Sequence, residues 1–407
     1  MAETHREAMA PREAAAAIAS ALTTAGFVAR FAGGCVRDEL LGHHPADYDV
    51  ATNATPDQIK ACFPKARGVG EHFGVMLVRH GGRTVEVATF RGEGPYRDGR
   101  RPERVEFSDE VTDANRRDFT INGLFMDPAT GTVIDHVGGR ADLQARLLRA
   151  IGDPDARLEE DRLRLLRAVR FAARFDMRMD PATAQAVQRH APELRGVSRE
   201  RVGQEVRRML LHTTRGVAVQ LIESLGLAPA TLLEASAALQ GTRVRQLPQH
   251  ASVPCALAAW MLDRPVEVPW QHRVKAWTDA LVLSNHERDA LHEALRLRDA
   301  LCAAWASMPV AARKRAAASP GFEDACALLV AEGLPLAQSI QADLVPLRAS
   351  GIAPQPLLDG DHLKRMGMQP GPDFRRILDT VYDAQLEGRI GSIAQAEVLA
   401  RQVATKA

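Results

Sequence analysis

The chain of 407 residues is long enough for two to four domains, and its composition, 46% hydrophobic and 25% charged, is that of a globular protein. The formal net charge of +1 does not exclude nucleic acid as a partner, because the local distribution of charge matters more than its sum. The five cysteines include no CxxC pair, which argues against a zinc site or a disulfide framework and for a reducing, cytoplasmic setting. No apolar run reaches the length of a membrane span, and the N-terminus does not resemble a signal peptide.

The predicted elements begin with a helix from about Pro11 to Thr24. An apolar run then indicates a strand that ends in the glycine pair Gly33-Gly34, and a short helix carrying Arg37 follows. Glycine lets a backbone approach phosphate groups closely. We therefore expect this turn to bind phosphate, with Arg37 within reach of the same site.

Two aspartates mark the next predicted strand. Asp47 and Asp49 are separated by one residue, and successive side chains of a strand alternate faces, so both carboxylates point the same way. Like charges this close repel each other unless a cation lies between them, and hard carboxylate oxygens suit Mg²⁺. The pattern predicts that Asp47 and Asp49 are catalytic metal ligands.

A β-hairpin with a glycine turn at residues 81–82 follows. Alternation places Glu86 on one face of its second strand, where a carboxylate is able to join Asp47 and Asp49 across the sheet as a third catalytic group. The pattern is equally compatible with Glu86 on the solvated face of an edge strand. Both interpretations stay open at this point.

Residues 91–110 are rich in Gly, Pro and charges of both signs, which predicts a long loop that is either functional or a tolerated insertion. The segment 116–125 is expected to form a short helix with Phe119 and Asn122 on one face. A second short helix is expected over 142–148, where it leads out of this part of the chain.

From residue 158 the pattern is helical to the end of the chain. The segment 159–175 contains no Gly or Pro and predicts one helix. Its arginines recur every three or four residues in one stripe: Arg164, Arg167, Arg170 and Arg174. Residues 159–212 contain 12 Arg against 8 Asp and Glu, which is a local net charge of +4. The stripe alone is also typical of an ordinary amphipathic helix with a solvated face.

Asp161 is expected one turn before Arg164 on the same side of this helix, and the pair suggests a hypothesis about base selection. Cytosine and adenine both present an amino donor beside a ring-nitrogen acceptor, whereas guanine and uracil present the reverse order. A carboxylate and a guanidinium would therefore pair with C and A. They would leave G and U with unpaired polar groups, at about 1–3 kcal/mol for each buried group.

Together these residues predict nucleotidyl transfer. Metal ions between paired carboxylates can bridge triphosphate oxygens, lower the pKa of an attacking hydroxyl and neutralise the leaving pyrophosphate. The GxxxxGK[ST] and GxGxxG motifs are missing, which excludes a P-loop and a dinucleotide-binding fold. The helical region 213–345 shows no catalytic constellation, and residues 357–407 predict a turn-helix-turn-helix unit.

The ordered motifs resemble those of the class II tRNA nucleotidyltransferase and bacterial poly(A) polymerase family. The matching segments are Gly33 to Asp38 with Asp47-Tyr48-Asp49, Arg116 to Asn122, Asp135 to Gly152, Glu160 to Arg164, and Ser198 to Glu205. The tail, residues 360–372, is similar to the C-terminal unit of bacterial CCA-adding members. Cys35 departs from the family pattern, in which a small residue such as alanine is usual.

The resemblance implies an α+β chain in which a polymerase-β-like nucleotidyltransferase head, a small mixed sheet with helices, precedes an all-α neck, body and tail. The expected parts are an N-terminal helix (1–26), the catalytic head (27–152), a neck with the base-reading motif (153–212), a body (213–345) and a tail that binds tRNA (346–407).

The resemblance also implies roles by position. The incoming nucleotide is expected to contact Gly33, Gly34, Arg37, Arg117, Asp118, Asn122, Asp161, Arg164, Arg167 and Arg170. Mg²⁺ is expected on Asp47 and Asp49, and the loop 91–110 is expected to take part in the switch from CTP to ATP. The expected activity is template-independent addition of CCA to the 3′ end of tRNA from CTP and ATP. Poly(A) polymerase and an A-adding tRNA nucleotidyltransferase are the alternatives. No membrane partner is expected, and the oligomeric state is left open.

Overall fold

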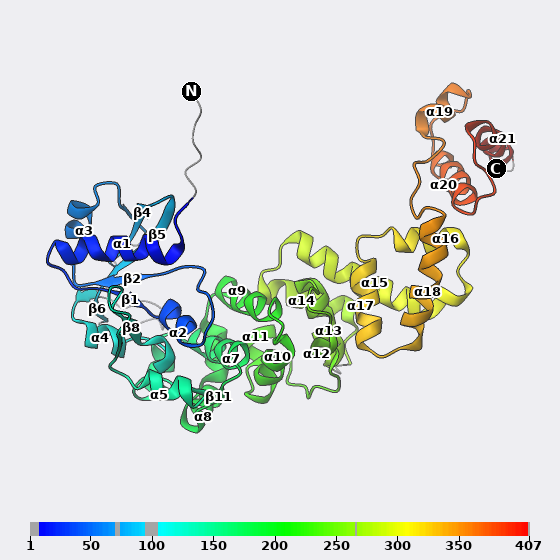
Figure 1. Cartoon of the computed structure of the whole chain (residues 1–407). Helices are drawn as coiled ribbons and strands as arrows, with labels where there is room; N and C mark the ends of the chain where they lie inside the picture. Colours follow the sequence, from blue (N-terminus) through cyan, green and yellow to red (C-terminus); the bar gives the residue numbers. More distant parts are fainter. Residues whose placement is uncertain (1–7, 70–73, 94–104, 265–266, 406–407) are drawn as a thin grey trace, which may run out of the picture. The chain divides into compact units, whose positions relative to one another are not determined.

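The structure, a computed structural model, describes residues 8–69, 74–93, 105–264 and 267–405 (Figure 1). The chain divides into two compact units. Unit 1 comprises residues 1–209 and 220–236, and unit 2 comprises residues 210–219 and 237–407. The finer division into head, neck, body and tail remains a prediction. No helix within the described ranges is both long and apolar enough to cross a membrane.

Unit 1 contains a seven-stranded sheet in the order β3-β4-β5-β2-β1-β8-β9. Its strands are β1 (Ala29–Ala32), β2 (Val50–Thr52), β3 (Arg67–Gly68), β4 (Val75–His80), β5 (Arg83–Thr89), β8 (Leu124–Met126) and β9 (Val133–Asp135). Two further pairs are β6 (Arg91–Glu93) with β7 (Val105–Phe107) and β10 (Leu147–Leu148) with β11 (Arg178–Met179). In the large sheet β2 and β5 are parallel and the other neighbours are antiparallel. The expected mixed sheet is confirmed.

Helices cover this sheet and continue beyond it. Unit 1 contains α1 (Pro11–Thr24), α2 (Gly34–Leu40), α3 (Pro56–Cys62), α4 (Glu110–Asn115), η2 (Thr120–Asn122), α5 (Gly139–Gln144), α6 (Pro154–Glu160), α7 (Arg164–Arg174), α8 (Pro181–His190), η3 (Ala191–Gly196), α9 (Arg199–Leu210, to residue 209) and α11 (Ala228–Leu232). Helix α1 lies across the strands (Figure 1) and buries Ala15, Ile18 and Leu22 completely, at the spacing of one helical face.

Unit 2 is helical throughout its described regular elements. They are α12 (Arg243–Gln246), α13 (Val253–Asp263), α14 (Trp270–Leu281), α15 (Asn285–Ala304), η4 (Trp305–Ser307), α16 (Val310–Ala317), α17 (Phe322–Ala331), α18 (Pro335–Ala349), α19 (Gly360–Arg365), α20 (Asp373–Leu386) and α21 (Ile393–Ala404), and α10 (Arg215–Ser224) contributes residues to both units. One apolar cluster gathers around Leu301, Trp305 and Ile340. A second gathers around Leu363 and Val381 in the last helices.

Local signals in the sequence predicted several elements correctly. Helix α1 has the expected bounds, Pro11 to Thr24. The expected hairpin is β4 with β5, and its turn residues Gly81 and Gly82 have φ angles of +54° and +79°. Positive φ at both central positions is what a two-residue hairpin turn of type I′ requires, and glycine adopts it without a steric penalty.

Of two expected short helices, the first is wrong and the second has the wrong bounds. In the segment 116–125 only Thr120 to Asn122 form a single 3₁₀ turn, and the chain then enters β8, which pairs with β1 and β9. In the segment 142–148 helix α5 ends at Gln144, and β10 pairs with β11 instead. Pairing with strands distant in sequence overrides the local helical pattern in both cases.

The single helix expected over 159–175 is also wrong. It is two helices, α6 and α7, separated by residues 161–163. Asp161 has extended backbone angles, φ −142° and ψ 101°, at the end of α6. Its carboxylate accepts a hydrogen bond from the Leu163 backbone N–H at 3.1 Å, an alternative to helical bonding that Asp readily supplies.

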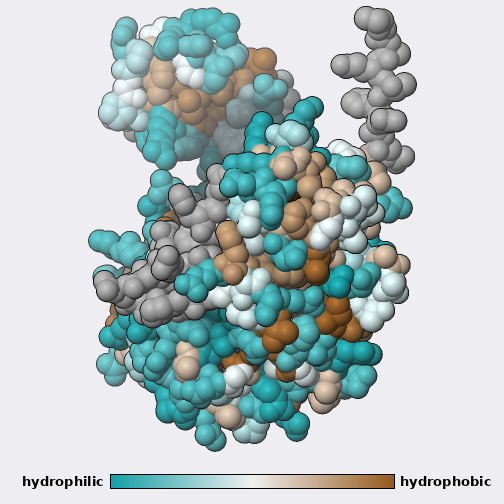
Figure 2. All heavy atoms as spheres, turned by 90° about the vertical axis from the view of Figure 1, so that its left-hand side faces the viewer, coloured by the Kyte–Doolittle hydropathy of each residue, from teal (hydrophilic) through white to brown (hydrophobic). Residues whose placement is uncertain are grey.

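The face of the molecule drawn in Figure 2 is mainly hydrophilic, and its apolar residues form small groups among polar ones. Exposed large apolar side chains on unit 1 include Val28, Leu40 and Phe107. Scattered apolar residues of this kind are normal on a globular protein.

Candidate functional site

Asp47 and Asp49 lie in extended chain immediately before β2, and not within the strand as expected. Both side chains are exposed, whereas Tyr48 and Val50 between and after them are buried. The alternation of faces therefore holds, because the extended chain continues the β1–β2 ladder: the Asp49 carbonyl accepts a hydrogen bond from the Ala32 N–H at 3.1 Å.

The position of Glu86 depends on the parallel pairing of β2 with β5. Val50 lies opposite Val87 in this pair, so the residues before them, Asp49 and Glu86, are neighbours on the exposed face. Of the two interpretations left open by the sequence, the structure supports a Glu86 carboxylate beside the aspartates. Its catalytic role remains a prediction.

The carboxylates beside the paired strands β2 and β5 suit a divalent cation. Although Asp49 is exposed, desolvation by the neighbouring protein atoms raises its pKa, together with the Glu86 and Asp47 carboxylates, to about 6, and Arg117 opposes the rise. Such crowding of negative charge is relieved by a cation with oxygen ligands. Within the described residues no group of three or more His, Cys, Asp or Glu is arranged to hold a metal. The aspartates would thus share the ion with phosphate oxygens and water, which is how Mg²⁺ is commonly bound.

The glycine turn lies against an arginine. Gly33 has a φ of +69°, which side chains other than glycine rarely adopt, and it precedes α2. A Cβ atom on Gly33 would lie 2.6 Å from Nη1 of Arg117. The absence of a side chain at this position is what allows the Arg117 guanidinium to approach the turn.

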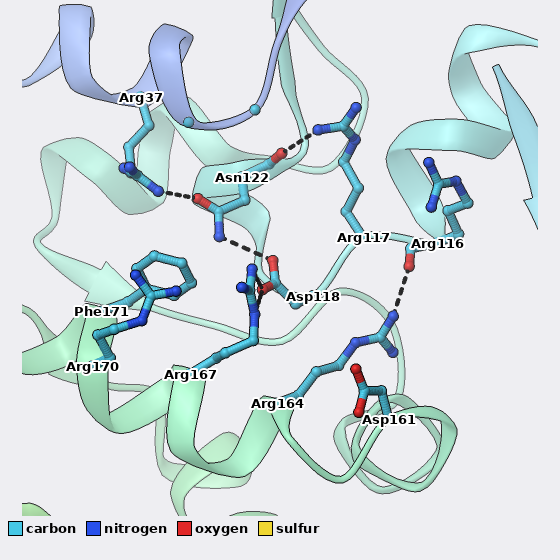
Figure 3. A pocket seen from close by; sticks show the side chains of 12 residues that line it. Arg37, Arg116, Arg117, Asp118, Asn122, Asp161, Arg164, Arg167, Arg170 and Phe171 are labelled. Carbon is cyan, nitrogen blue, oxygen red and sulfur yellow. Dashed lines mark hydrogen bonds and ion pairs between the residues drawn. The ribbon is translucent and has the colours of Figure 1, made fainter. Parts of the chain in front are cut away.

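A cavity of about 420 Å³ opens beside this turn (Figure 3). It is lined by Gly33, Gly34, Arg37, Arg116, Arg117, Asp118, Asn122, Asp161, Arg164, Arg167, Arg170 and Phe171. All ten residues that were expected to contact a nucleotide are among them, and they come from α2, from the segment 116–122, and from α7 with the residue that ends α6. Six guanidinium groups at one cavity favour a highly anionic ligand.

A chain of hydrogen bonds crosses the cavity wall from α2 to α7 (Figure 3). Arg37 Nη1 donates to Asn122 Oδ1 at 2.5 Å, Asn122 Nδ2 donates to Asp118 Oδ1 at 2.9 Å, and Arg167 Nε donates to Asp118 Oδ2 at 2.8 Å. Burial would raise the pKa of Asp118, but Arg167 and the Asn122 hydrogen bond lower it to about 2. The carboxylate is therefore ionised, and it holds Arg167 and the Asn122 amide in fixed orientations.

Asp161 and Arg164 both line the cavity, but each is anchored by a different partner. Arg201 on α9 donates to Asp161 Oδ2 at 2.7 Å. Arg164 forms an ion pair with Glu160 and donates to the Arg116 carbonyl at 3.1 Å (Figure 3). The two side chains thus line the same cavity from different elements, because Asp161 ends α6 and Arg164 begins α7.

Sequence reasoning missed two lining residues, Arg116 and Phe171. The Phe171 ring lies under Arg170, with the guanidinium carbon 4.3 Å from its centroid, and also near Arg37 and Arg167 at 5.2 and 5.1 Å. An aromatic residue on an amphipathic helix is usually a core residue, so its spacing did not point to the cavity. Its position among three arginines is a tertiary feature.

Comparison with known families gives two matches. Residues 29–149 match a model described as "Poly A polymerase head domain". Residues 176–239 match a model described as "Probable RNA and SrmB- binding site of polymerase A". The first match contains Asp47, Asp49 and Glu86, and it ends shortly before α6.

The relatives in sequence include CCA-adding enzymes and poly(A) polymerases, such as Poly(A) polymerase I of Salmonella typhi, which is 44% identical over 200 residues, 46% of this chain and 43% of that relative. The similar solved structures include CCA-adding enzymes. The enzyme from Geobacillus thermodenitrificans is 42% identical over 219 residues, so the chain spans 54% of that relative's length. The enzyme from Limosilactobacillus fermentum is 34% identical over 394 residues, which is 93% of this chain and 94% of that relative. The solved structure of the Bacillus stearothermophilus CCA-adding enzyme in complex with CTP is 27% identical, with a TM-score of 0.75 over 98% of this chain and 99% of the other.

Proposed function

The chain belongs to the family of CCA-adding enzymes and poly(A) polymerases, and from this membership we propose that it adds CCA to the 3′ end of tRNA without a nucleic-acid template. CTP and ATP are the substrates and pyrophosphate is the second product. The observation that carries the proposal is the arginine-lined cavity beside Gly33, which contains every residue expected to contact a nucleotide. The likeness to CCA-adding enzymes along nearly the whole chain supports the same activity.

Nucleotidyltransferases of this family use divalent metal ions, and we propose Mg²⁺ for this chain. Asp47 and Asp49 would hold it, with Glu86 as the nearest further carboxylate. When bound, the ion would supply Lewis-acid stabilisation of the triphosphate and would lower the pKa of the attacking hydroxyl. The guanidinium groups of the cavity bind and orient the triphosphate through charge-assisted hydrogen bonds.

We propose that Asp161 and Arg164 select the base. The Asp161 carboxylate accepts from the amino group of cytosine or adenine, and the Arg164 guanidinium donates to the adjacent ring nitrogen. Arg201 orients the Asp161 carboxylate, and Glu160 orients the Arg164 guanidinium. A carboxylate oxygen keeps acceptor capacity beyond one hydrogen bond, so Asp161 can bind Arg201 and a base together.

The alternative function is poly(A) polymerase or A-only addition, because both family descriptions refer to polymerase A. The full-length similarity to a CCA-adding enzyme favours the first proposal. Of the loop 91–110, which was expected to take part in the switch from CTP to ATP, residues 94–104 lie outside the described residues, and the strands β6 and β7 flank them. We propose a cytoplasmic location, where tRNA and both nucleotides are present.

The test is incorporation of single nucleotides into tRNA that lacks its CCA end. With CTP alone the tRNA should gain two nucleotides, and with CTP and ATP together it should gain three and then stop. The Asp49→Ala variant is the matched control, and it should bind tRNA but transfer nothing. A long A tract would support the poly(A) alternative, and A addition without C addition would support the A-only enzyme.

A further inference from the structure

Asp113 is a buried carboxylate beside the cavity that the proposed reaction does not use. It lies on α4, its residue is 1% exposed, and it does not line the cavity. Its Oδ1 accepts from Arg116 Nε at 2.8 Å and from the Arg91 backbone N–H at 3.4 Å. Its Oδ2 accepts from Arg117 Nη2 at 2.9 Å and from Arg117 Nε at 3.2 Å. One carboxylate therefore holds two consecutive arginines, one on each oxygen.

Arg116 and Arg117 keep the Asp113 carboxylate ionised. Burial would raise the pKa of Asp113, but Arg117 and Arg116 lower it below its ordinary value. Hydrogen bonds between an ionised carboxylate and a guanidinium are short and directional, and a two-pronged contact such as that of Arg117 also fixes the plane of the guanidinium. Asp113 thus determines where these two guanidinium groups lie.

Each of the two arginines reaches a different side of the cavity (Figure 3). Arg117 Nη1 donates to the Asn122 carbonyl at 3.2 Å and lies where a Cβ atom of Gly33 would be 2.6 Å away. The Arg116 carbonyl accepts from Arg164 Nη2 at 3.1 Å. Asp113 is consequently connected to the glycine turn through one arginine and to the proposed base-selecting arginine through the backbone of the other.

We propose that Asp113 is a positioning residue for nucleotide binding, which acts through Arg117 and Arg116 without touching the substrate. The inference rests on the proposed function of the cavity. Arginine side chains lose much rotational freedom when they are ordered, and a protein that orders them in advance lowers the cost of ligand binding. Without the Asp113 charge the two adjacent cations would repel each other, and Arg117 would leave the turn.

The first experiment is steady-state incorporation of CTP by the folded full-length Asp113→Asn variant. We expect its KM for CTP to rise about 10-fold or more with a smaller change in kcat, by analogy with metal sites, where loss of a residue that orients a ligand side chain has an effect of this size. An unchanged or lowered KM would overturn the proposal. A lowered KM would mean that removal of the Asp113 negative charge strengthens the attraction of the cavity for triphosphate more than the loss of arginine orientation weakens it. Inactivity of the wild-type protein in the same assay would instead count against the proposed function.

The matched control is Asn115→Ala on the same helix. Asn115 is the last residue of α4, and its Nδ2 donates a hydrogen bond to the Val111 carbonyl at 2.9 Å, but its side chain bonds to neither arginine in the described structure. Its loss should leave the KM for CTP unchanged. A rise in KM equal to that of Asp113→Asn would show that any disturbance of α4 weakens nucleotide binding, which would contradict a specific role of Asp113.

A double-mutant cycle separates positioning from general destabilisation. If Asp113 acts through Arg117, the Asp113→Asn change should alter KM far less in an Arg117→Ala background than in the wild type. Fully additive effects would contradict the proposal. Should Asp113→Asn fail to fold, Arg117→Lys carries the test: it keeps the charge but loses the two-pronged contact, so its KM should rise nearly as much as that of Arg117→Ala. A wild-type KM for this variant would overturn the proposal.

Discussion

At the scale of single residues, the cavity is built from cations whose orientations are set by neighbouring groups. Arg37 is held by Asn122, Arg167 by Asp118, and Arg170 donates to Glu205 at 2.7 Å. Guanidinium groups that are oriented by the protein bind a triphosphate with less loss of freedom than solvated ones. Substitutions at residues that touch no ligand should therefore change nucleotide binding.

Gly33 provides the first prediction. The Gly33→Ala variant should lose about 1–3 kcal/mol of stability, because its φ of +69° is unfavourable for alanine, and it should also lose nucleotide binding, because the new Cβ displaces Arg117. Thermal unfolding and the KM for CTP measure the two effects. Gly131→Ala is the control: its φ is +70° but no atom lies within 4 Å of the added Cβ, so stability should fall without a change in KM. A normal KM in Gly33→Ala would contradict this account.

Base selection provides the second prediction. Replacement of Asp161 or Arg164 by alanine should relax the preference for CTP and ATP over GTP and UTP, by about 10-fold or more for each lost hydrogen-bonding group. The ratio of kcat/KM values for the four nucleotides measures the preference. Arg162→Ala is the control, because Arg162 pairs with Glu193 at 2.9 Å and does not line the cavity. Unchanged ratios in the Asp161 and Arg164 variants would reject the base-reading role.

At the scale of elements, the break between α6 and α7 allows one carboxylate and several arginines to face the same cavity. A continuous helix would have placed Asp161 directly beneath Arg164, where the two would pair with each other. In the structure Asp161 leaves the helix and pairs with Arg201 on α9 instead. Each of the two side chains therefore has its own anchor within unit 1.

His190 on α8 bridges α6 and η3 through its two ring nitrogens. His190 Nε2 lies 2.9 Å from Asp155 and Nδ1 lies 3.0 Å from Glu193, and Arg189 and Arg162 pair with the same two carboxylates. Burial alone would lower the pKa of His190, but hydrogen bonds to Glu193 and Asp155 raise it above its ordinary value. The protonated ring donates to both carboxylates, so it contributes stability to this part of unit 1.

The pH dependence of this contribution is the third prediction. Because the pKa in the folded state is raised, the contribution should be complete below the unfolded-state pKa of about 6.5 and should disappear as the pH rises through the folded-state pKa. The loss of unfolding free energy in His190→Gln should thus be larger at pH 6 than at pH 9, as measured by urea denaturation. His80→Gln, at an exposed position on β4, is the control for a general effect of pH. An equal loss at both pH values would contradict the prediction.

At the scale of the whole molecule, the two units differ in what they contain. Unit 1 contains the cavity, the aspartate pair and residues 159–209 of the locally basic segment. The described regular elements of unit 2 are helices. The formal net charge of +1 conceals the excess of arginine in residues 159–212. Local patches of positive charge, rather than the total charge, decide whether a protein surface attracts RNA.

The fourth prediction concerns tRNA binding. If tRNA is held mainly through its phosphates, the affinity should fall by about 10-fold or more between roughly 50 and 200 mM salt, with a linear dependence of log K on log salt concentration. Filter binding or fluorescence anisotropy with the full-length protein measures this slope. Asp47→Ala should show the same slope although it transfers no nucleotide. An affinity that is independent of salt would reject binding through the phosphates.

The sequence by itself determined the parts of the site that depend on short-range patterns. The Gly33-Gly34 turn, the shared face of Asp47 and Asp49 and the glycine hairpin all follow from the geometry of neighbouring residues along the chain. The motif series also identified the family and ten of the twelve lining residues of the cavity, although their roles remain predictions.

Only the tertiary structure decided how these parts meet. Glu86 lies beside Asp49 because β2 pairs in parallel with β5, and local patterns do not specify which distant strand becomes a neighbour. The helix break at Asp161 and the position of Phe171 among arginines likewise depend on contacts with other elements. The physical reason is the same in each case: periodicity specifies the face of an element, whereas packing and long-range pairing specify what that face meets.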